Sequence, residues 1–395
     1  MKHTYFTLIL TFVFFYSCNN SGKSDLASNK TNNFLIHSKA LNEDREIYIK
    51  LPPNYDSQNR EYPVVYVLDG EWNFEYVASY LNYMFDNNIF PEMIVTGVRN
   101  VNRNRDYVPR PDSYFDDTGE ANTFLKFVKN EWVEEIERSF STNGERIIIG
   151  HSFGGVFALH SLFSDPALFD AYLILGASAW IADNVLLDEA NAYFANPTDS
   201  NAFVYMAVGE GDGGPTVPSN QSLVEIFEKK SPESLEWYFE ITKKTDHFKN
   251  FSSGMHNGFM ALFPAWGFAD ELTDAARKSG VLGVNEWFNV KHNTLGMRFQ
   301  PSWFDLGVVA LTLSQEGHSD VAITVIDELK SYYPQNGHIA SFAATVFEMN
   351  GQYRKALNEY ERAIKIVNEQ KLHPNTLHLG NLERGATRML EHLMN

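Results

Sequence analysis

The sequence GHSFGG occupies residues 150–155, between the apolar stretch RIII (residues 146–149) and the apolar segment VFALHSLF (residues 156–163). This is a G-x-S-x-G pattern in a strand–turn–helix setting, where a serine hydroxyl can act as a nucleophile. In such a sharp turn, side chains in place of the glycines would collide with the neighbouring strand and helix. The amide of Phe153, at the start of the helix, could face a developing oxyanion. Ser152 is therefore the predicted nucleophile, and the alternative is a glycine-rich turn without chemistry.

Working outward from this motif, strand-like and helix-like segments alternate. Residues 34–50 predict two strands around a turn, and helical patterns follow at residues 122–140 and 222–230. Short apolar stretches that predict buried strands lie at residues 62–68, 93–98, 146–149, 171–175, 203–208 and 235–241. This alternation predicts an α/β fold, with a mostly parallel sheet and helices on both faces. Such sheets place their chemistry beyond the carboxyl ends of the strands.

A nucleophilic serine needs a base, and in this arrangement the chain order is serine, acid, histidine. His256 lies in SGMHNG (residues 253–258), which we interpret as a flexible loop after the last strand. That position predicts His256 as the base. His247 follows its strand closely and is predicted to be a surface or pocket-rim residue.

The orienting acid is expected after the strand at residues 203–208, in the segment GEGDGGP (residues 209–215). Asp212, four residues past the strand end, suits a loop that turns back toward the base, so it is the favoured acid. Glu210 is the alternative, and Asp246 is a third candidate.

The second oxyanion donor is expected in the loop after the strand at residues 62–68. The segment there reads LDGEWNF (residues 68–74). A backbone amide near Glu71 or Trp72 is the predicted donor, because Gly70 lets the backbone approach closely.

Four arginines lie within twelve residues of an otherwise acidic chain, at Arg99, Arg103, Arg105 and Arg110. One interpretation is a solvated loop in which Arg105 pairs with a local carboxylate such as Asp106. The other is a rim that recognises an anionic substrate, since arginine binds carboxylates and catecholates with two parallel hydrogen bonds. Arg103 and Arg105 are then candidate rim residues, together with Trp72 as a platform for a sugar or catechol ring.

Four segments in the same order resemble the Putative esterase family: YPVVYVLDG (residues 62–70), RDYVP (residues 105–109), residues 150–155 and the His256 loop. This family, sometimes called the esterase D or siderophore-esterase-like group, includes feruloyl and acetyl xylan esterases, ferric-siderophore trilactone hydrolases and mycolyl transferases. The resemblance covers about residues 33–275.

The resemblance implies an α/β-hydrolase fold and a serine esterase that needs no cofactor and no metal. It also implies a nucleophile at Ser152, a base at His256, an acid at Asp212, and oxyanion amides at Phe153 and Glu71.

The first 18 residues have the features of a targeting segment. A short basic start precedes an apolar run at residues 5–16, which is too short to span a membrane. The pair Ser17-Cys18 that follows resembles a bacterial lipobox, in which Cys18 would be lipidated. An ordinary signal peptide cut near Ser17 is the alternative. Residues 19–32 read as a flexible tether, so the chain is predicted to be exported and anchored in the cell envelope, on a bacterial membrane that we expect to be the outer one.

Residues 276–395 lack strand signals and show helical periodicity. Gly317 and Ala322 recur as Gly351 and Ala356, each at an offset of 34 residues. A 34-residue period with small residues at helix crossings resembles the tetratricopeptide repeat, and a plain helical bundle is the alternative. Such repeats bind peptides or other subunits, or shape the rim of a neighbouring pocket, so a protein partner is one of two interpretations of this region.

The overall charge limits the classes of partner. The chain has 32 Lys+Arg and 50 Asp+Glu, a formal net charge of -18, which argues against nucleic acid. Its one cysteine rules out an intramolecular disulfide framework and a cysteine-based zinc site. The predicted function is an exported serine esterase that acts on a small-molecule or glycan ester, such as an acylated or feruloylated polysaccharide. A ferric-siderophore trilactone is the alternative substrate, and an interaction scaffold without turnover is the competing class.

Overall fold

The computed structural model of the 395-residue chain describes residues 32–394, apart from residues 54, 56, 58, 59, 88, 197–200, 264–266, 296–301 and 370–376. For residues 291–295 it describes the backbone alone. The targeting segment, including Cys18, and most of the tether therefore lie outside the described residues. Within the described part of the chain, no helix combines the length and the apolar character that crossing a membrane requires.

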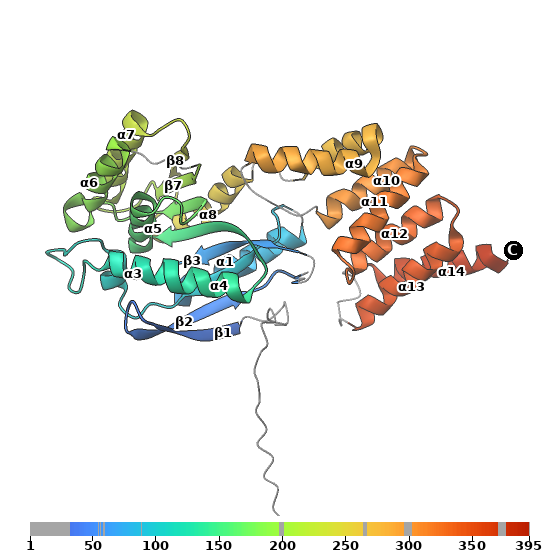
Figure 1. Cartoon of the computed structure of the whole chain (residues 1–395), viewed down its shortest axis with the longest axis horizontal. Coiled ribbons are helices and arrows are strands. Elements are labelled where there is room, and N and C mark those ends of the chain that lie inside the picture. The colour runs from blue at the N-terminus through green and yellow to red at the C-terminus, as the bar shows by residue number, and fades with distance from the viewer. Residues whose placement is uncertain are drawn as a thin grey trace, which may run out of the picture.

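An eight-stranded sheet forms the centre of the first region (Figure 1), and its strands lie in the order β1-β2-β4-β3-β5-β6-β7-β8. The first three strands in this order pair antiparallel, and all others pair parallel. The strands are β1 (Asn32–Ser38), β2 (Glu43–Lys50), β3 (Tyr62–Val67), β4 (Ile94–Val98), β5 (Thr142–His151), β6 (Ala171–Leu175), β7 (Phe203–Gly209) and β8 (Glu236–Thr242). The predicted strands and the predicted mostly parallel sheet are confirmed, but β8 lies at the edge of the sheet and is not buried as the apolar stretch at residues 235–241 predicted.

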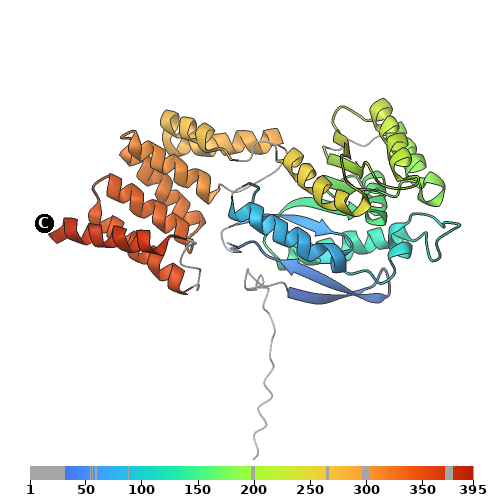
Figure 2. The ribbon, with the colours of Figure 1, turned by 180° about the vertical axis from the view of Figure 1, so that it is seen from behind.

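Helices cover both faces of this sheet. One face packs on α1 (Gly70–Asp86) and α8 (His247–Leu262), which lie in front in Figure 2. The helices on the other side are α2 (Arg103–Tyr107), α3 (Ala121–Phe127), η1 (Val128–Val133), α4 (Glu134–Ser139), α5 (Phe153–Ser164), α6 (Ile181–Ala195) and α7 (Thr216–Lys230). Alternate residues of β3 point into the two layers: Val65 and Val67 contribute to the first core, and Val64 and Tyr66 to the second.

The remainder of the chain is helical and has a hydrophobic core of its own. Its helices are α9 (Ala269–Leu295), α10 (Trp303–Gln315), α11 (Ser319–Tyr332), α12 (Gly337–Met349), α13 (Tyr353–Glu369) and α14 (Leu379–Met394). The predicted domain boundary at residues 275 and 276 falls inside α9, whose residues Leu272 and Ala276 belong to this second core.

The 34-residue offset is visible as two successive helix pairs. The pair α10–α11 begins at residues 303 and 319, and the pair α12–α13 begins at residues 337 and 353, so both starts are shifted by 34 residues. Gly317 and Gly351 lie in the two turns with φ of 84° and 70°, a region that favours glycine. Both glycines thus lie in the turn between the two helices of a pair, and membership of the tetratricopeptide class stays a prediction.

The two regions meet at the beginning of β3. The guanidinium of Arg60 lies 4.8 Å from the ring centroid of Tyr62 and 4.2 Å from that of Tyr333, which directly follows α11. Arg60 also pairs with Glu92, at 2.6 Å. Because both partners of this ion pair are nearly inaccessible to solvent, the contact is a buried junction between the sheet and the helical region.

Candidate active site

Ser152 is the single residue between β5 and α5, and its backbone conformation is strained. Its φ is 59° and its ψ is -117°, which places a residue with a side chain in a region that glycine favours. The flanking glycines permit this turn: a Cβ on Gly150 would lie 2.3 Å from the carbonyl oxygen of Gly154, and one on Gly155 would lie 3.1 Å from Ala177. The motif therefore forms the predicted strand–turn–helix elbow.

His247 and Asp212 form a pair next to this elbow. Nδ1 of His247 lies 3.0 and 3.1 Å from the two carboxylate oxygens of Asp212. Asp212 follows β7, its side chain is 3% exposed, and its carboxylate is close to Gly176, where a Cβ would lie 3.2 Å from Oδ2. His247 is the first residue of α8 and lines the same cavity as Ser152. The structure thus brings a serine, a histidine and an acid together.

His256 is not part of this group. It lies in the third turn of α8, where nine residues correspond to about 13 Å along the helix axis from His247. Its Nδ1 hydrogen-bonds with the hydroxyl of Tyr80, at 2.8 Å, in an exposed contact with α1. The prediction that the His256 segment is a loop is wrong, and the geometry gives no support to His256 as the base.

The two glycines beside His256 explain the error. A Cβ on Gly254 would lie 2.9 Å from Leu175, and one on Gly258 would lie 2.8 Å from Tyr205. These glycines therefore let α8 lie flat on the sheet, and they do not make the segment a loop. The signal that could have placed the helix correctly is the spacing of Phe251, Met255 and Phe259, which are four residues apart and buried against one face.

The other candidate acids have structural partners. Glu210 accepts a hydrogen bond from the backbone N–H of Lys244 through Oε2, at 3.1 Å, and so closes the turn between β8 and α8. Asp246 caps the N-terminus of α8 by accepting from the backbone N–H of Lys249, at 2.9 Å. Only Asp212 of the three reaches a histidine ring in the cavity.

The predicted oxyanion donors lie at two neighbouring helix N-termini. Glu71 is in the first turn of α1, and Phe153 begins α5. Within the described part of the chain neither backbone N–H has a protein partner, whereas the N–H of Trp72 donates to the carbonyl of Asp69, at 3.0 Å. The carboxylate of Glu71 turns aside and accepts hydrogen bonds from Asn100.

A cavity of about 480 Å³ opens over these groups. It is lined by Trp72, Asn73, Arg103, His151, Ser152, His247, Phe248 and Phe251. Trp72 and Phe248 are 67% and 80% exposed, which is unusual for large aromatic residues. The two rings therefore offer an apolar surface at the mouth of the cavity.

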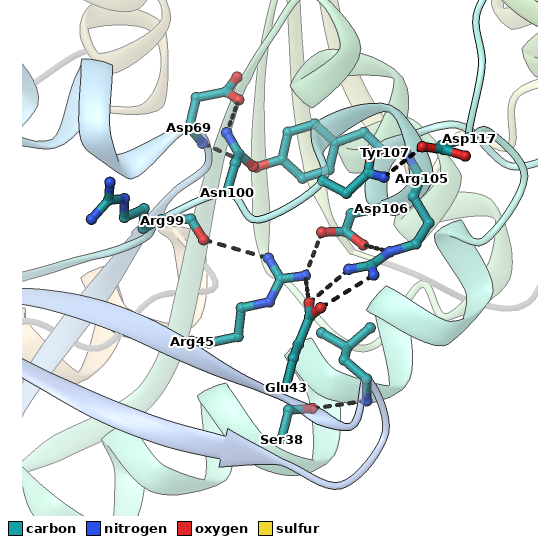
Figure 3. A network of polar contacts seen from close by, with 12 residues as sticks. Ser38, Glu43, Arg45, Asp69, Arg99, Asn100, Arg105, Asp106, Tyr107 and Asp117 are labelled. Atoms are coloured by element: carbon teal, nitrogen blue, oxygen red, sulfur yellow. Dashed lines mark hydrogen bonds and ion pairs between the residues drawn. The ribbon is translucent and has the colours of Figure 1, made fainter.

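The four clustered arginines separate in the structure. Arg103 lines the cavity, and its guanidinium lies 5.7 Å from the ring centroid of Trp72. Arg105 lies apart from the cavity and pairs with Glu43 and Asp106, in the network that Figure 3 shows. The predicted pair of Arg105 and Asp106 is confirmed. Because both partners hold Arg105, the structure does not support it as a rim residue.

The remaining two arginines are also engaged elsewhere. Arg99 pairs with Glu46 on the surface, and Arg110 pairs with Asp188. Among the four, Arg103 is therefore the one that the structure brings to Ser152.

Two further polar side chains reach the site without having been predicted. Ser178 places its Oγ 3.3 Å from Oγ of Ser152. His151 donates from Nε2 to the carbonyl oxygen of His247, at 2.9 Å, and the ring centroids of the two histidines are 4.5 Å apart. Burial, together with the charge of His247, lowers the pKa of His151 to about 4, so this ring is neutral at physiological pH. The signal for His151 was its place inside the motif, whereas Ser178 has no local signature.

Within the described residues, no group of three or more His, Cys, Asp or Glu side chains lies close enough to hold a metal ion.

Comparison with known proteins identifies the first region. The model of the family described as Putative esterase matches residues 38–266, which is more than half of the chain. Among solved structures, an IroE-like serine hydrolase from Shewanella oneidensis superimposes with a TM-score of 0.64 at 25% sequence identity, over 77% of this chain and 100% of the other.

Two curated relatives match shorter stretches. The uncharacterized protein YbbA of Bacillus subtilis is 25% identical over 178 residues, which is 43% of this chain and 70% of YbbA. The siderophore enterobactin esterase of Emericella nidulans is 35% identical over 95 residues, which is 22% of this chain and 28% of that enzyme.

Proposed function

Because the chain belongs to the Putative esterase family and is a carboxylic ester hydrolase, we propose that Ser152, His247 and Asp212 carry out the hydrolysis as a catalytic triad. The observation that carries this assignment is the pair of Asp212 and His247, whose imidazole lines the same cavity as the strained Ser152. A serine–histidine–acid arrangement is recognised by its geometry, whichever sequence positions supply it.

In the proposed reaction, Oγ of Ser152 attacks the ester carbonyl carbon while Nε2 of His247 takes the hydroxyl proton. Asp212 holds the hydrogen on Nδ1, which keeps Nε2 as the acceptor, and stabilises the imidazolium that forms. The amides of Phe153 and Glu71 receive the oxyanion. His247 then gives the proton to the leaving alkoxide, and an acyl-enzyme on Ser152 remains.

A water molecule completes the cycle by the same route. His247 takes a proton from this water as it attacks the acyl carbonyl, and then returns the proton to Oγ of Ser152 as the acid leaves. Each step transfers one proton through Nε2, so the mechanism needs only this chain's own residues and water.

For the substrate, we favour a small-molecule ester that carries aromatic rings, of the ferric-siderophore trilactone class. The similarity to the siderophore enterobactin esterase of Emericella nidulans supports this choice, as do the exposed rings of Trp72 and Phe248 at the mouth of the cavity. An acylated or feruloylated polysaccharide remains the second substrate class, because a feruloyl ring would fit the same two aromatic side chains.

The test of the chemistry is the variant Ser152→Ala. We expect it to abolish hydrolysis of a short-chain aryl ester while the circular dichroism spectrum stays unchanged. Retained turnover in that variant would overturn the mechanism. A panel of ferric trilactones and of acetylated and feruloylated sugars, compared by kcat/KM, distinguishes the two substrate classes.

For location, we propose that the chain is exported and lipid-anchored through Cys18, on the basis of the apolar run at residues 5–16 and the adjacent Ser17-Cys18 pair. Incorporation of labelled palmitate should be lost in Cys18→Ser. Equal labelling of both chains would contradict the lipid anchor.

For the helical region, we propose a binding site for an acidic peptide segment of a partner protein. A groove of about 720 Å³ between α12, α13 and α14 is lined by Arg384, Arg388 and His392, among others. Arg388 and Glu348 pair with each other, at 2.6 Å, so among the described lining residues Arg384 is the arginine that can pair with a carboxylate of the peptide. Binding of a fluorescent poly-glutamate peptide should be weakened by Arg384→Glu and unaffected by Lys365→Glu, a variant outside the groove lining.

A further inference from the structure

Resting on the proposed triad, we propose that Arg103 is a positioning residue that holds the two halves of the oxyanion site at a fixed separation. One of these halves is the first turn of α1, which supplies the amide of Glu71. The other is the elbow, which supplies the amide of Phe153. The two amides come from different segments of the chain, and an oxyanion needs both at hydrogen-bonding distance.

Arg103 bridges these two segments with one planar group. Its Nε donates to Oδ1 of Asp69, at 2.6 Å, and its Nη2 donates to Oδ2 of the same carboxylate, at 2.9 Å. Nη2 also donates to the carbonyl oxygen of His151, at 3.0 Å. Asp69 stands two residues before Glu71, and His151 stands directly before Ser152, so the guanidinium connects the two turns that carry the donors.

Asp69 is itself in a conformation that needs support. It is 1% exposed and has φ of 55°, a left-handed backbone on a residue with a side chain. Its N–H donates to the hydroxyl oxygen of Tyr107, at 3.0 Å, and its Oδ1 also accepts from Asn100, at 2.7 Å (Figure 3). A buried carboxylate of this kind requires a cation, and Arg103 is the cation that touches it.

The helix that carries Arg103 is fixed by contacts of its own. It is the first residue of α2, and this helix is capped by Asn102, whose side chain accepts from the N–H of Arg105, at 3.1 Å. Three residues after Arg103, Asp106 is fully buried and pairs with Arg45 of β2 and with Arg105 (Figure 3). These ion pairs attach α2 to the sheet, so the backbone position of Arg103 is set independently of any ligand.

A second bridge continues from the elbow to the base. His151, whose carbonyl accepts from Arg103, donates from its own ring to the carbonyl of His247. Asp69, Arg103, His151 and His247 therefore form one hydrogen-bonded line across the site. These hydrogen bonds connect Asp69, which precedes α1, to His247, the first residue of α8.

This role makes a prediction that differs from substrate recognition. A positioning residue affects the transition state of every ester alike, so its loss lowers kcat and leaves KM nearly unchanged. A residue that binds a substrate anion affects the KM of anionic esters and leaves neutral esters unchanged. Removal of an oxyanion donor outright lowers kcat by about 10²- to 10³-fold. A donor that is only displaced should lower it by about 10- to 100-fold.

The experiment compares Arg103→Ala and Arg103→Lys with the wild-type chain on a neutral and an anionic aryl ester. Arg99→Ala is the matched control, since Arg99 lies on the same segment but pairs on the surface with Glu46. We expect both Arg103 variants to lose kcat about equally on the two esters, and Arg99→Ala to lose none. Added guanidinium ion should restore part of the kcat of Arg103→Ala, and an aryl boronic acid, which mimics the tetrahedral intermediate, should bind both variants more weakly.

Other results would overturn the proposal. Unchanged kcat on the neutral ester, or a rise confined to the KM of the anionic ester, would show that Arg103 contacts substrate or contributes nothing. If Arg103→Ala does not fold, Arg103→Lys decides, because lysine keeps the charge but has one nitrogen in place of the planar guanidinium that binds both oxygens of Asp69. The proposed triad is tested separately: an inactive Ser152→Ala together with fully active Arg103 variants would reject the positioning role and leave the triad in place.

Discussion

Both oxygens of the Asp212 carboxylate face one nitrogen of His247, with Oδ1 at 3.0 Å and Oδ2 at 3.1 Å from Nδ1. The carboxylate is 3% exposed and the imidazole is 27% exposed, so the pair is closed on the acid side and open on the side of the cavity. An imidazole held in this way presents Nε2 to the space that Ser152 also borders.

Substitution of each candidate base in turn, His247 and His256, tests the triad most directly. His247→Gln should lower kcat by at least about 10³-fold, because Ser152 then loses its proton acceptor. His256→Ala should keep kcat within about twofold, since its ring contacts Tyr80 on the surface. Turnover of an aryl ester by the purified chains measures both. An active His247→Gln chain, or a folded and inactive His256→Ala chain, would reverse the assignment.

The acid can be tested with amide substitutions of similar shape. Asp212→Asn should lower kcat by about 10⁴-fold, because an amide no longer selects the imidazole tautomer that accepts from serine. Glu210→Gln serves as the control and should remain active, since its role is to accept from the N–H of Lys244. A larger loss in the Glu210 variant than in the Asp212 variant would contradict the pairing described above.

The tight turn at the elbow predicts a large effect of a single methyl group. In Gly150→Ala, the new Cβ would meet the carbonyl oxygen of Gly154 at 2.3 Å, and backbone cannot move aside cheaply. We expect the free energy of unfolding to fall by about 2 kcal/mol or more. Gly213→Ala, where no atom lies within 4 Å of the new Cβ, should change it little. Urea unfolding at neutral pH measures the difference, and equal stability of the two variants would show that the turn relaxes.

His151 predicts how stability changes with pH. Its pKa falls from 6.5 to about 4 in the folded chain because burial disfavours the charged ring, so below pH 6.5 the unfolded chain binds a proton that the folded chain does not. The free energy of unfolding should therefore decrease as the pH falls from 6.5 to about 4, by up to roughly 3 kcal/mol from this residue.

The variant His151→Gln isolates this contribution, because glutamine keeps a hydrogen-bond donor and has no titrating ring. As the pH falls from 6.5 to about 4, the free energy of unfolding should decrease more in the wild type than in the variant. A constant difference would show that His151 does not titrate in the way its burial implies.

Much of the fold followed from local patterns. The apolar stretches that predicted strands correspond to strands β3 to β8, and the GHSFGG motif forms the predicted elbow at residues 150–155. These features were accessible because apolar periodicity and a glycine-dependent turn are properties of neighbouring residues.

The errors concern contacts between distant residues. Gly254 and Gly258 suggest flexibility when the sequence is considered alone, but they are required by the packing of α8 on Leu175 and Tyr205. In the same way, Arg103 and Arg105 are two residues apart, and their roles differ because Arg105 pairs with Glu43, 62 residues away in the chain. No local pattern distinguishes the two arginines.

The strand β3 has a different neighbour at each end. Near its first residue, the guanidinium of Arg60 lies against the ring of Tyr62 and against that of Tyr333, which belongs to the helical region. Just after its last residue lies Asp69, which forms an ion pair with Arg103. Six residues of extended backbone, about 20 Å, separate the two. One strand therefore joins the contact with Tyr333 of the helical region to the segment that carries Asp69 and the amide of Glu71.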